Sequence, residues 1–298
     1  RCAERMSPMK IVLTPNPYRD KQFRTVQQAK KILESCGVET VMCLPFDVDR
    51  DYELPKTMDF RDLHREIKNA DMLVCFGGDG TILHASKIAT AHGLPILGVN
   101  IGTMGFIAEL EAGELELLRK LPTGDYTLEP RSMIDVTVTG ANGQKLLHET
   151  ALNDAVVTKG AIARVIQIGI SCDGVDATAF SGDGVIVCTA TGSTAYSMSA
   201  GGPIMEPSAK NLLITPICAH AMLAKSIVVG PQRVIGIRTG KIGRHNAFLS
   251  VDGGRAFRLS PGDITTITSS SQITQLVRLK DTSFFEILNH KFIDRQRY

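Results

Sequence analysis

The sequence predicts an α/β N-terminal domain with a mainly parallel sheet, followed by a β-rich, β-sandwich-like C-terminal domain. Three observations lead to this fold class. The chain has 298 residues, a length that suits two modest domains better than one core. Short apolar runs alternate with helical patterns up to about residue 124. From residue 125 the helical period gives way to short strands and hairpin turns.

The first part of the chain alternates between strand and helix patterns. Helices are expected over residues 18–35, 60–68, 81–91 and 111–120, and strands over 10–14, 39–44, 71–76 and 95–99. Gly37 and Gly93 are expected to end two of the helices, because glycine readily adopts the left-handed conformation of a helix C-cap. This alternation favours parallel pairing of the strands, since each helix carries the chain back across the sheet.

The second part has the turn signals of antiparallel strands. Asn142-Gly143 and Asp173-Gly174 are typical of two-residue hairpin turns. Strands are expected over residues 131–139, 144–150, 165–172, 175–180, 184–189, 226–229, 234–239, 247–251, 256–259, 263–268 and 273–280. A last helical pattern covers residues 283–292. We therefore expect an α/β domain at 1–124, joined by 281–298, and a β-rich domain at 125–280, with ligand binding in the cleft between them.

Composition excludes several classes of protein. A hydrophobic fraction of 43% and a charged fraction of 21% are those of a globular protein. No apolar run reaches the length of a membrane span, so no membrane partner is expected. Tryptophan is absent and aromatic residues are 5%, which argues against nucleic acid as a partner. The seven cysteines include no C-x-x-C pair, so the chain is expected to be reduced and cytoplasmic.

The net charge of +2 is unevenly distributed. Residues 225–298 hold 12 Lys and Arg against 5 Asp and Glu. This basic quarter fits either an anionic ligand or a solvated basic face.

Three glycine-rich clusters carry most of the chemical information. Gly77-Gly78-Asp79-Gly80-Thr81 follows a buried strand and opens a helix, a context in which backbone N–H groups bind phosphate. The alternative is a tight turn without a ligand. Asp79 favours the first interpretation, because a carboxylate beside phosphates needs a metal to bind or a hydroxyl proton to accept. Residues 98–106 follow the next strand at the same sheet edge, and residues 189–203 supply many small donors, as a purine nucleotide requires.

These clusters, together with Leu152-Asn153-Asp154 and Ser181-Gly182-Asp183-Gly184, resemble those of the NAD kinases of bacterial type in content and order. The resemblance covers roughly residues 10–292. It implies an enzyme that phosphorylates the 2′-hydroxyl of the adenosine ribose of NAD to give NADP. ATP or polyphosphate would be the donor, with a divalent metal ion such as Mg²⁺ as cofactor. It also implies a homodimer or homotetramer.

The resemblance also implies a set of site residues. Asp79 matches the catalytic proton acceptor, Gly80 a phosphate contact and His84 a position that reaches the dinucleotide. Asn153 and Asp154 match the pair that holds the ribose hydroxyls. Asp252 matches an aspartate near the reacting ribose, a candidate for contact with a metal or a hydroxyl. The remaining expected contacts are Phe106 as an apolar wall for adenine, Arg164 near a phosphate or the nicotinamide, Asp183 at the nicotinamide end, and the adenine-binding residues Thr194, Ala195, Tyr196, Ser197, Met198 and Ser199.

Two other functions remain open from the residues alone. Lipid kinases and phosphofructokinases share the Gly-Gly-Asp-Gly element, so a lipid or sugar kinase is one alternative. A non-catalytic dinucleotide-binding protein is the other. The Thr-Gly-Ser-Thr-Ala-Tyr segment at residues 191–196 favours the NAD kinases over the first, and the intact Asp79 weighs against the second.

Overall fold

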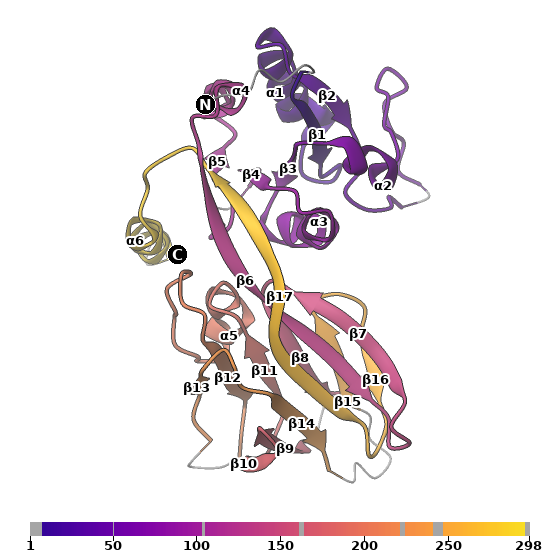
Figure 1. Ribbon diagram of the computed structural model, residues 1–298, viewed down its shortest axis with the longest axis vertical. Helices are drawn as coiled ribbons and strands as arrows, with labels where there is room; N and C mark the ends of the chain where they lie inside the picture. The colour runs from indigo at the N-terminus through magenta and orange to yellow at the C-terminus, as the bar shows by residue number, and fades with distance from the viewer. Residues whose placement is uncertain are drawn as a thin grey trace. The chain divides into compact units, whose positions relative to one another are not determined.

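The computed structural model describes residues 8–49, 51–102, 105–160, 164–220, 224–240 and 247–295 (Figure 1). The chain divides into two compact units, of which unit 1 comprises residues 1–130 and 274–298 and unit 2 comprises residues 131–273. Two long strands, β6 (Thr127–Thr139) and β17 (Ile264–Arg278), pair with each other, and each contains residues of both units. The boundary between the units therefore falls inside strands rather than in loops.

Unit 1 has a parallel sheet with helices on both faces. The strands are β1 (Lys10–Pro15), β2 (Glu39–Met42), β3 (Met72–Gly77), β4 (Ile96–Asn100) and β5 (Leu110–Glu111). The helices are α1 (Arg24–Ser35), α2 (Leu63–Glu66), α3 (Asp79–Ala91), α4 (Lys120–Thr123) and α6 (Phe284–Arg295). The strands run in the order β2-β1-β3-β4 with every pairing parallel, and β5 adds to β4 in parallel.

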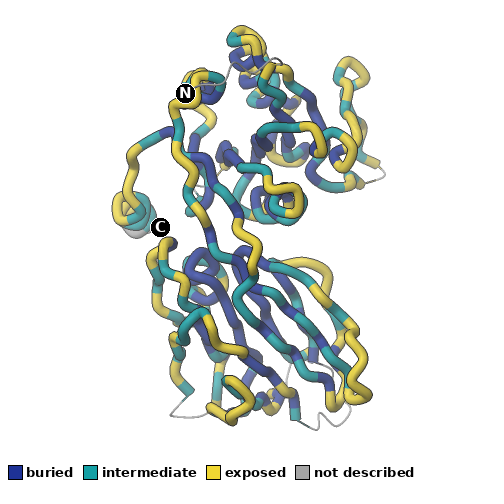
Figure 2. Tube along the Cα trace, viewed as in Figure 1, coloured by how far each residue is buried: buried dark blue, intermediate teal, exposed yellow. Residues whose placement is uncertain are grey.

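Alternating side chains divide the core of unit 1 into two layers. Ile11 and Leu13 of β1 pack with α1, whereas Val12 between them packs with α3. This follows from the two-residue period of a strand, which directs successive side chains to opposite faces. Strands β3 and β4 are buried along their whole length, as Figure 2 shows, because helices cover both of their faces.

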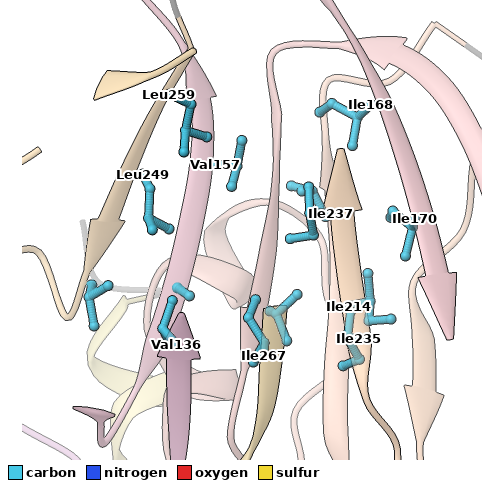
Figure 3. Close-up of a cluster of buried hydrophobic side chains, with 14 of the residues drawn as sticks. Val136, Val157, Ile168, Ile170, Ile214, Ile235, Ile237, Leu249, Leu259 and Ile267 are labelled. Carbon is cyan, nitrogen blue, oxygen red and sulfur yellow. The ribbon is translucent and has the colours of Figure 1, made fainter. Parts of the chain in front are cut away.

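Unit 2 is a β-sandwich. One layer contains β6, β7 (Lys145–Ala151), β9 (Ile166–Cys172), β10 (Val175–Gly182), β14 (Ile235–Thr239) and β17. The other is a six-stranded antiparallel sheet in the order β13 (Ile227–Val229), β12 (Leu212–Ile217), β11 (Gly184–Cys188), β8 (Asp154–Lys159), β15 (Ala247–Val251) and β16 (Phe257–Leu259). A single cluster joins the layers, with Val136 and Ile267 from the first and Val157 and Leu249 from the second (Figure 3).

The fold class predicted from the sequence is confirmed, as are both hairpins. Asp173 and Gly174 have φ +53° and +81°, the left-handed values that a two-residue hairpin turn needs. In the other hairpin Gly143 has φ +80°, and the Gly140 N–H donates to the Gln144 carbonyl, so its loop has three residues instead of two. Gly37 and Gly93 also have positive φ after the helices that they follow.

Several elements differ from the prediction. Strands β8 and β12 were not predicted, β6 starts at Thr127 instead of 131, and α2 covers only Leu63–Glu66 of the helix expected at 60–68. The first helix starts at Arg24 instead of 18, because Asp20 accepts hydrogen bonds from the backbone N–H groups of Thr25 and Val26 and so caps it there. Residues 111–120 form a short 3-10 helix (Leu115–Arg119) that continues into α4, rather than one α-helix. The strands expected at 263–268 and 273–280 are one strand, β17, whose exposed residues 271–273 interrupt the apolar pattern.

We expect Leu13→Ala in β1 to lower the free energy of unfolding by about 2–5 kcal/mol, because Leu13 is fully buried on the face of β1 that packs against α1. The matched control is Leu128→Ala in the same unit, where the side chain is 47% exposed and the loss should stay within about 0.5 kcal/mol. Urea unfolding followed by circular dichroism measures both. Equal losses would contradict the two-layer core.

Candidate functional site

The loops after β1, β3 and β4 meet at one edge of the unit 1 sheet, because parallel strands end on the same side. The backbone N–H of Asn16 donates to the Phe76 carbonyl (2.8 Å), and its amide Nδ2 donates to Thr81 Oγ1 at the start of α3 (2.9 Å). The N–H of Ile101 donates to the Gly77 carbonyl (3.0 Å). These bonds join all three loops around the glycine cluster at 77–81.

Asp79 is the first residue of α3 and is held by the loop after β4. Its Oδ2 accepts a hydrogen bond from the Phe106 N–H (2.8 Å), and its Oδ1 accepts one from the Ile107 N–H (3.2 Å). Gly105 makes this contact possible, since a Cβ at that position would overlap the Asp79 carboxylate. A carboxylate in the first turn of a helix also interacts favourably with the helix dipole.

The next two predicted residues of α3 are exposed. Gly80 is exposed, and an added Cβ at this position would meet no described atom within 4 Å. The His84 ring lies edge-on to the Phe46 ring, with 5.8 Å between centroids. Partial desolvation lowers the pKa of His84, and the positive charge of Lys87 lowers it further.

Phe106 is half-buried beside Asp79, and the ammonium group of Lys291 lies 3.9 Å from its ring centroid. Lys291 belongs to α6, so the C-terminal helix supplies a cation over the ring that was expected to contact adenine. Residues 103 and 104 of the same glycine cluster lie outside the described residues.

In unit 2, Asp252 holds the segment 152–154 from one side. Its Oδ2 accepts a hydrogen bond from the Leu152 N–H (2.8 Å), and its Oδ1 accepts bonds from the N–H groups of Asn153 (2.8 Å) and Asp154 (3.1 Å). The Asp252 N–H in turn donates to the Asp154 carbonyl (2.9 Å). The structure thus brings three of the predicted site residues, Asn153, Asp154 and Asp252, together.

The loop after β11 holds the same segment from the other side. Thr189 donates through Oγ1 to the Leu152 carbonyl (2.6 Å) and through its N–H to the Asn153 carbonyl (2.9 Å). A Cβ at Gly192 would overlap the Asn153 backbone, so only glycine allows this approach. The side chain of Asn153 is 6% exposed, and its Oδ1 has no hydrogen-bond partner among the residues that the structure describes.

Asp154 lies buried next to Asp252 and is 5% exposed. Burial raises the pKa of its carboxyl group to about 7, and the negative charge of Asp252 contributes to the rise. Asp154 therefore changes its charge near neutral pH.

The predicted adenine segment is split between buried and exposed side chains. A 3-10 turn (Gly192–Thr194) leads into α5 (Tyr196–Ser199). Ser197 is fully buried, and its hydroxyl is hydrogen bonded to Thr215 Oγ1 (2.8 Å), so this side chain holds the loop in place. Tyr196 and Ser199 are exposed, and Thr194, Ala195 and Met198 are half-buried.

Asp183 lies at the opposite end of β8 from Asp154. Asp183 forms an ion pair with Lys159 (2.6 Å) at the last residue of β8, whereas Asp154 is the first residue of that strand. Five residues of extended chain separate the two ends by about 16 Å. Arg164 is exposed and lies two residues before the start of β9, and residues 161–163 lie outside the described ones.

Sequence reasoning missed Lys159, Thr189 and Gly105 as parts of the site. Gly105 and Thr189 lie in clusters recognised as glycine-rich or hydroxyl-rich, but nothing in the spacing shows which atoms they contact. Nothing in the sequence points to Lys159. Its partner Asp183 is set by the pairing of β8 with β11, which places Thr158 opposite Gly184 and so brings the next residue, Lys159, beside Asp183.

We expect Asp154→Asn to be more stable than the wild type at pH 8 and nearly equal to it at pH 4. Between the ordinary pKa of 3.8 and the raised value of about 7, the folded protein keeps a proton that the unfolded chain has released, so stability falls as the pH rises. The difference should be a few kcal/mol at most, since each pKa unit corresponds to roughly 1.4 kcal/mol.

Urea unfolding of both proteins at pH 4 and pH 8 measures this effect. The control is Asp176→Asn, which changes an exposed carboxylate in the same unit. A stability difference for Asp154→Asn that does not change with pH would show that the ionisation of Asp154 is not the cause.

The sequence is similar to known NAD kinases over nearly the whole chain. Residues 11–126 match the family model of the ATP-NAD kinase N-terminal domain, and residues 152–279 match that of the C-terminal domain. The NAD kinase of Carboxydothermus hydrogenoformans is 38% identical over 242 residues, which cover 81% of this chain and 86% of that protein. The NAD kinase of Acetivibrio thermocellus is 33% identical over 291 residues, covering 96% and 98%.

Solved structures share the fold. A yeast NADH kinase complexed with NADH superimposes with a TM-score of 0.82 at 24% identity, over 95% of this chain and 87% of that one. An NAD kinase from Archaeoglobus fulgidus in complex with ATP has a TM-score of 0.71 at 25% identity, over 95% and 98%. With both family models and these relatives matched over most of its length, the chain belongs to the NAD kinase family.

Proposed function

We propose that Asp79 is the catalytic base of this chain and accepts the proton of the 2′-hydroxyl of the adenosine ribose of NAD. As a member of its family, the chain phosphorylates NAD to NADP with ATP as donor. The observation that carries the proposal for Asp79 is the pair of N–H groups, from Phe106 and Ile107, that orients its carboxylate. A base must be held in position to remove a proton as the nucleophile attacks.

The surroundings of Asp79 support phosphoryl transfer at this place. The exposed Gly80 lies at the start of α3, where the positive end of the helix dipole complements phosphate oxygens. His84 lies one turn further along the same helix, and we propose that it reaches the dinucleotide. Phe106 keeps its proposed contact with adenine through the part of the ring that Lys291 does not cover.

We propose that NAD is held in unit 2 by Asn153 and Asp154. The enclosed Asn153 Oδ1 has no protein partner among the described residues, and a buried amide oxygen of this kind is stabilised by a ligand hydroxyl that donates to it. Asp154 would accept from a second hydroxyl when it is ionised. Residues Thr194–Ser199 would bind the adenine, mainly through the exposed Tyr196 and Ser199 and the loop backbone.

Asp183 and Arg164 are proposed to act at the nicotinamide end or on a phosphate. The separation of Asp183 from Asp154 along β8 favours a role at a different part of the dinucleotide. It also allows the alternative that Asp183 serves the site of a second copy. We propose a homodimer or homotetramer, supported by the edge strand β10, whose Val175 is 71% exposed.

The described residues contain no group of three or more His, Cys, Asp or Glu side chains arranged to hold a metal ion. The side chains described here therefore do not form a complete metal site, and we assign none of them as a ligand. A divalent ion such as Mg²⁺ would enter on the phosphates of ATP, as is common for nucleotide enzymes. Use of polyphosphate as donor is likewise a proposal.

Among the described residues, no helix is long and apolar enough to cross a membrane. The described cysteines are all free thiols, which suits a reducing compartment, so we propose a cytoplasmic location. No membrane or nucleic-acid partner is proposed. Family membership excludes the lipid and sugar kinases that share the Gly-Gly-Asp-Gly element.

We expect Asp79→Asn to lower kcat by roughly 10²–10⁴-fold, because the amide cannot accept the hydroxyl proton. The assay follows NADP formation from NAD, ATP and Mg²⁺, with polyphosphate in parallel. The KM for NAD should change little, since Asn keeps the size of the side chain. Unchanged turnover in the variant would exclude Asp79 as the base.

We expect Gly105→Ala to lower kcat by about 10²-fold, because the new methyl group displaces the Asp79 carboxylate and small misplacements of a catalytic group are costly. Gly113→Ala is the matched control, since a Cβ there meets no described atom within 4 Å. The same NADP assay applies to both. Equal activity of the two variants would mean that the contact between Gly105 and Asp79 does not matter for turnover.

A further inference from the structure

We propose that Asp252 is a positioning residue for the NAD-binding segment 152–154 rather than a ligand of a metal ion or of the ribose. The proposal rests on the function proposed above for Asn153 and Asp154. It replaces the expectation, drawn from the resemblance to the family, that Asp252 itself touches a metal or a hydroxyl.

The two oxygens of Asp252 receive three backbone N–H groups in a row, from Leu152, Asn153 and Asp154, at 2.8–3.1 Å. Donor and acceptor are about 100 residues apart in the chain, so the contact is not part of a local turn. It arises because β15 pairs with β8, which places Val251 opposite Ala155 and Asp252 beside the start of β8. The Asp252 N–H returns a bond to the Asp154 carbonyl, which locks the two strand ends in register.

Asp252 and Gly253 are the two central residues of a tight turn in which both have left-handed φ, a conformation that Asp-Gly tolerates well. The φ of Asp252 is +49°, in the left-handed region that side chains other than Asn and Asp rarely adopt, and Gly253 follows with φ +66°. The turn returns the Gly254 N–H to the Val251 carbonyl (2.9 Å). The turn directs the Asp252 carboxylate toward the backbone N–H groups of residues 152–154.

Thr189 completes the clamp from the opposite side. It donates to the carbonyls of Leu152 and Asn153, so Asp252 takes the N–H groups of the segment and Thr189 serves its C=O groups. The backbone is thereby fixed, while the side-chain oxygen of Asn153 has no partner among the described residues. A clamp of this kind presents side chains to a ligand at a fixed position, which reduces the ordering cost of binding.

The same bonds argue against a direct role for the Asp252 carboxylate. If it turned toward a metal ion or a ribose hydroxyl, it would release backbone N–H groups of a segment in which Asn153 and Asp154 are more than nine-tenths buried. Buried N–H groups without an acceptor are strongly unfavourable.

The test compares Asp252→Gly with Asp173→Gly. Glycine tolerates the left-handed backbone at both positions, so each change removes the carboxylate without adding strain. Asp173 is closely matched, because it has φ +53°, precedes a glycine, and holds the distant Val234 N–H (2.9 Å) in the same unit. Unlike Asp252, it contacts none of the proposed site residues in the part of the chain that the structure describes.

For Asp252→Gly we expect the KM for NAD to rise about tenfold or more, with kcat within about threefold and the KM for ATP within about twofold of the wild type. NAD affinity measured by calorimetry without ATP should fall by the same factor as the KM rises. Asp173→Gly should leave all of these values unchanged. Asp252→Asn, which keeps one acceptor oxygen, should be intermediate, and it replaces the glycine variant if that variant does not fold.

Several outcomes would overturn the proposal. A fall in kcat that is relieved by raising the Mg²⁺ concentration would make Asp252 a metal contact. Equal effects of Asp252→Gly and Asp173→Gly on the KM for NAD would indicate a general loss of structure in unit 2. Unchanged NAD affinity would show that the clamp is not needed. If the wild type formed no NADP, the proposed function would fail, while calorimetry with NAD would still test the clamp.

Discussion

Backbone N–H groups that have no backbone partner, such as those in the first turn of a helix or in a loop, need acceptors when they are buried, and three aspartate carboxylates supply them in this structure. Asp20 accepts two such groups and sets the start of α1. Asp79 accepts two from the loop after β4. Asp252 accepts three from the segment that begins β8. A carboxylate has two acceptor oxygens, so each of these residues fixes a short stretch of backbone by accepting two or three of its N–H groups.

At Asp79 and near Asp252, a glycine lets a second loop approach closely. Gly105 lets the loop after β4 approach Asp79, and Gly192 lets the loop after β11 approach Asn153. In both units, a side chain from one element and a glycine from another fix a short segment at the end of a strand. The arrangement holds the functional groups by backbone contacts and leaves side-chain atoms such as Asn153 Oδ1 available to a ligand.

Prediction from the sequence succeeded where local chemistry decides the structure. The turns at Asn142-Gly143 and Asp173-Gly174 follow from residues that tolerate positive φ, and the α/β pattern of unit 1 follows from the period of its apolar residues. It failed where side-chain contacts or strand pairing decide. The start of α1 depends on the reach of the Asp20 side chain. Strand β17 is continuous through exposed residues, and its pairing with β6 and β14 is not visible in its own apolar pattern.

The sequence by itself determined the fold class, the glycine clusters and the resemblance to the NAD kinases, with Asp79 as the candidate base. These features depend only on residue types and on short spacings along the chain. Only the tertiary structure decided what each of these residues contacts. The hold of Asp252 on residues 152–154, the pairing of Lys159 with Asp183 and the position of Lys291 over Phe106 join residues far apart in the chain. Such contacts depend on strand register and on how helices pack, and one sequence read locally does not specify either.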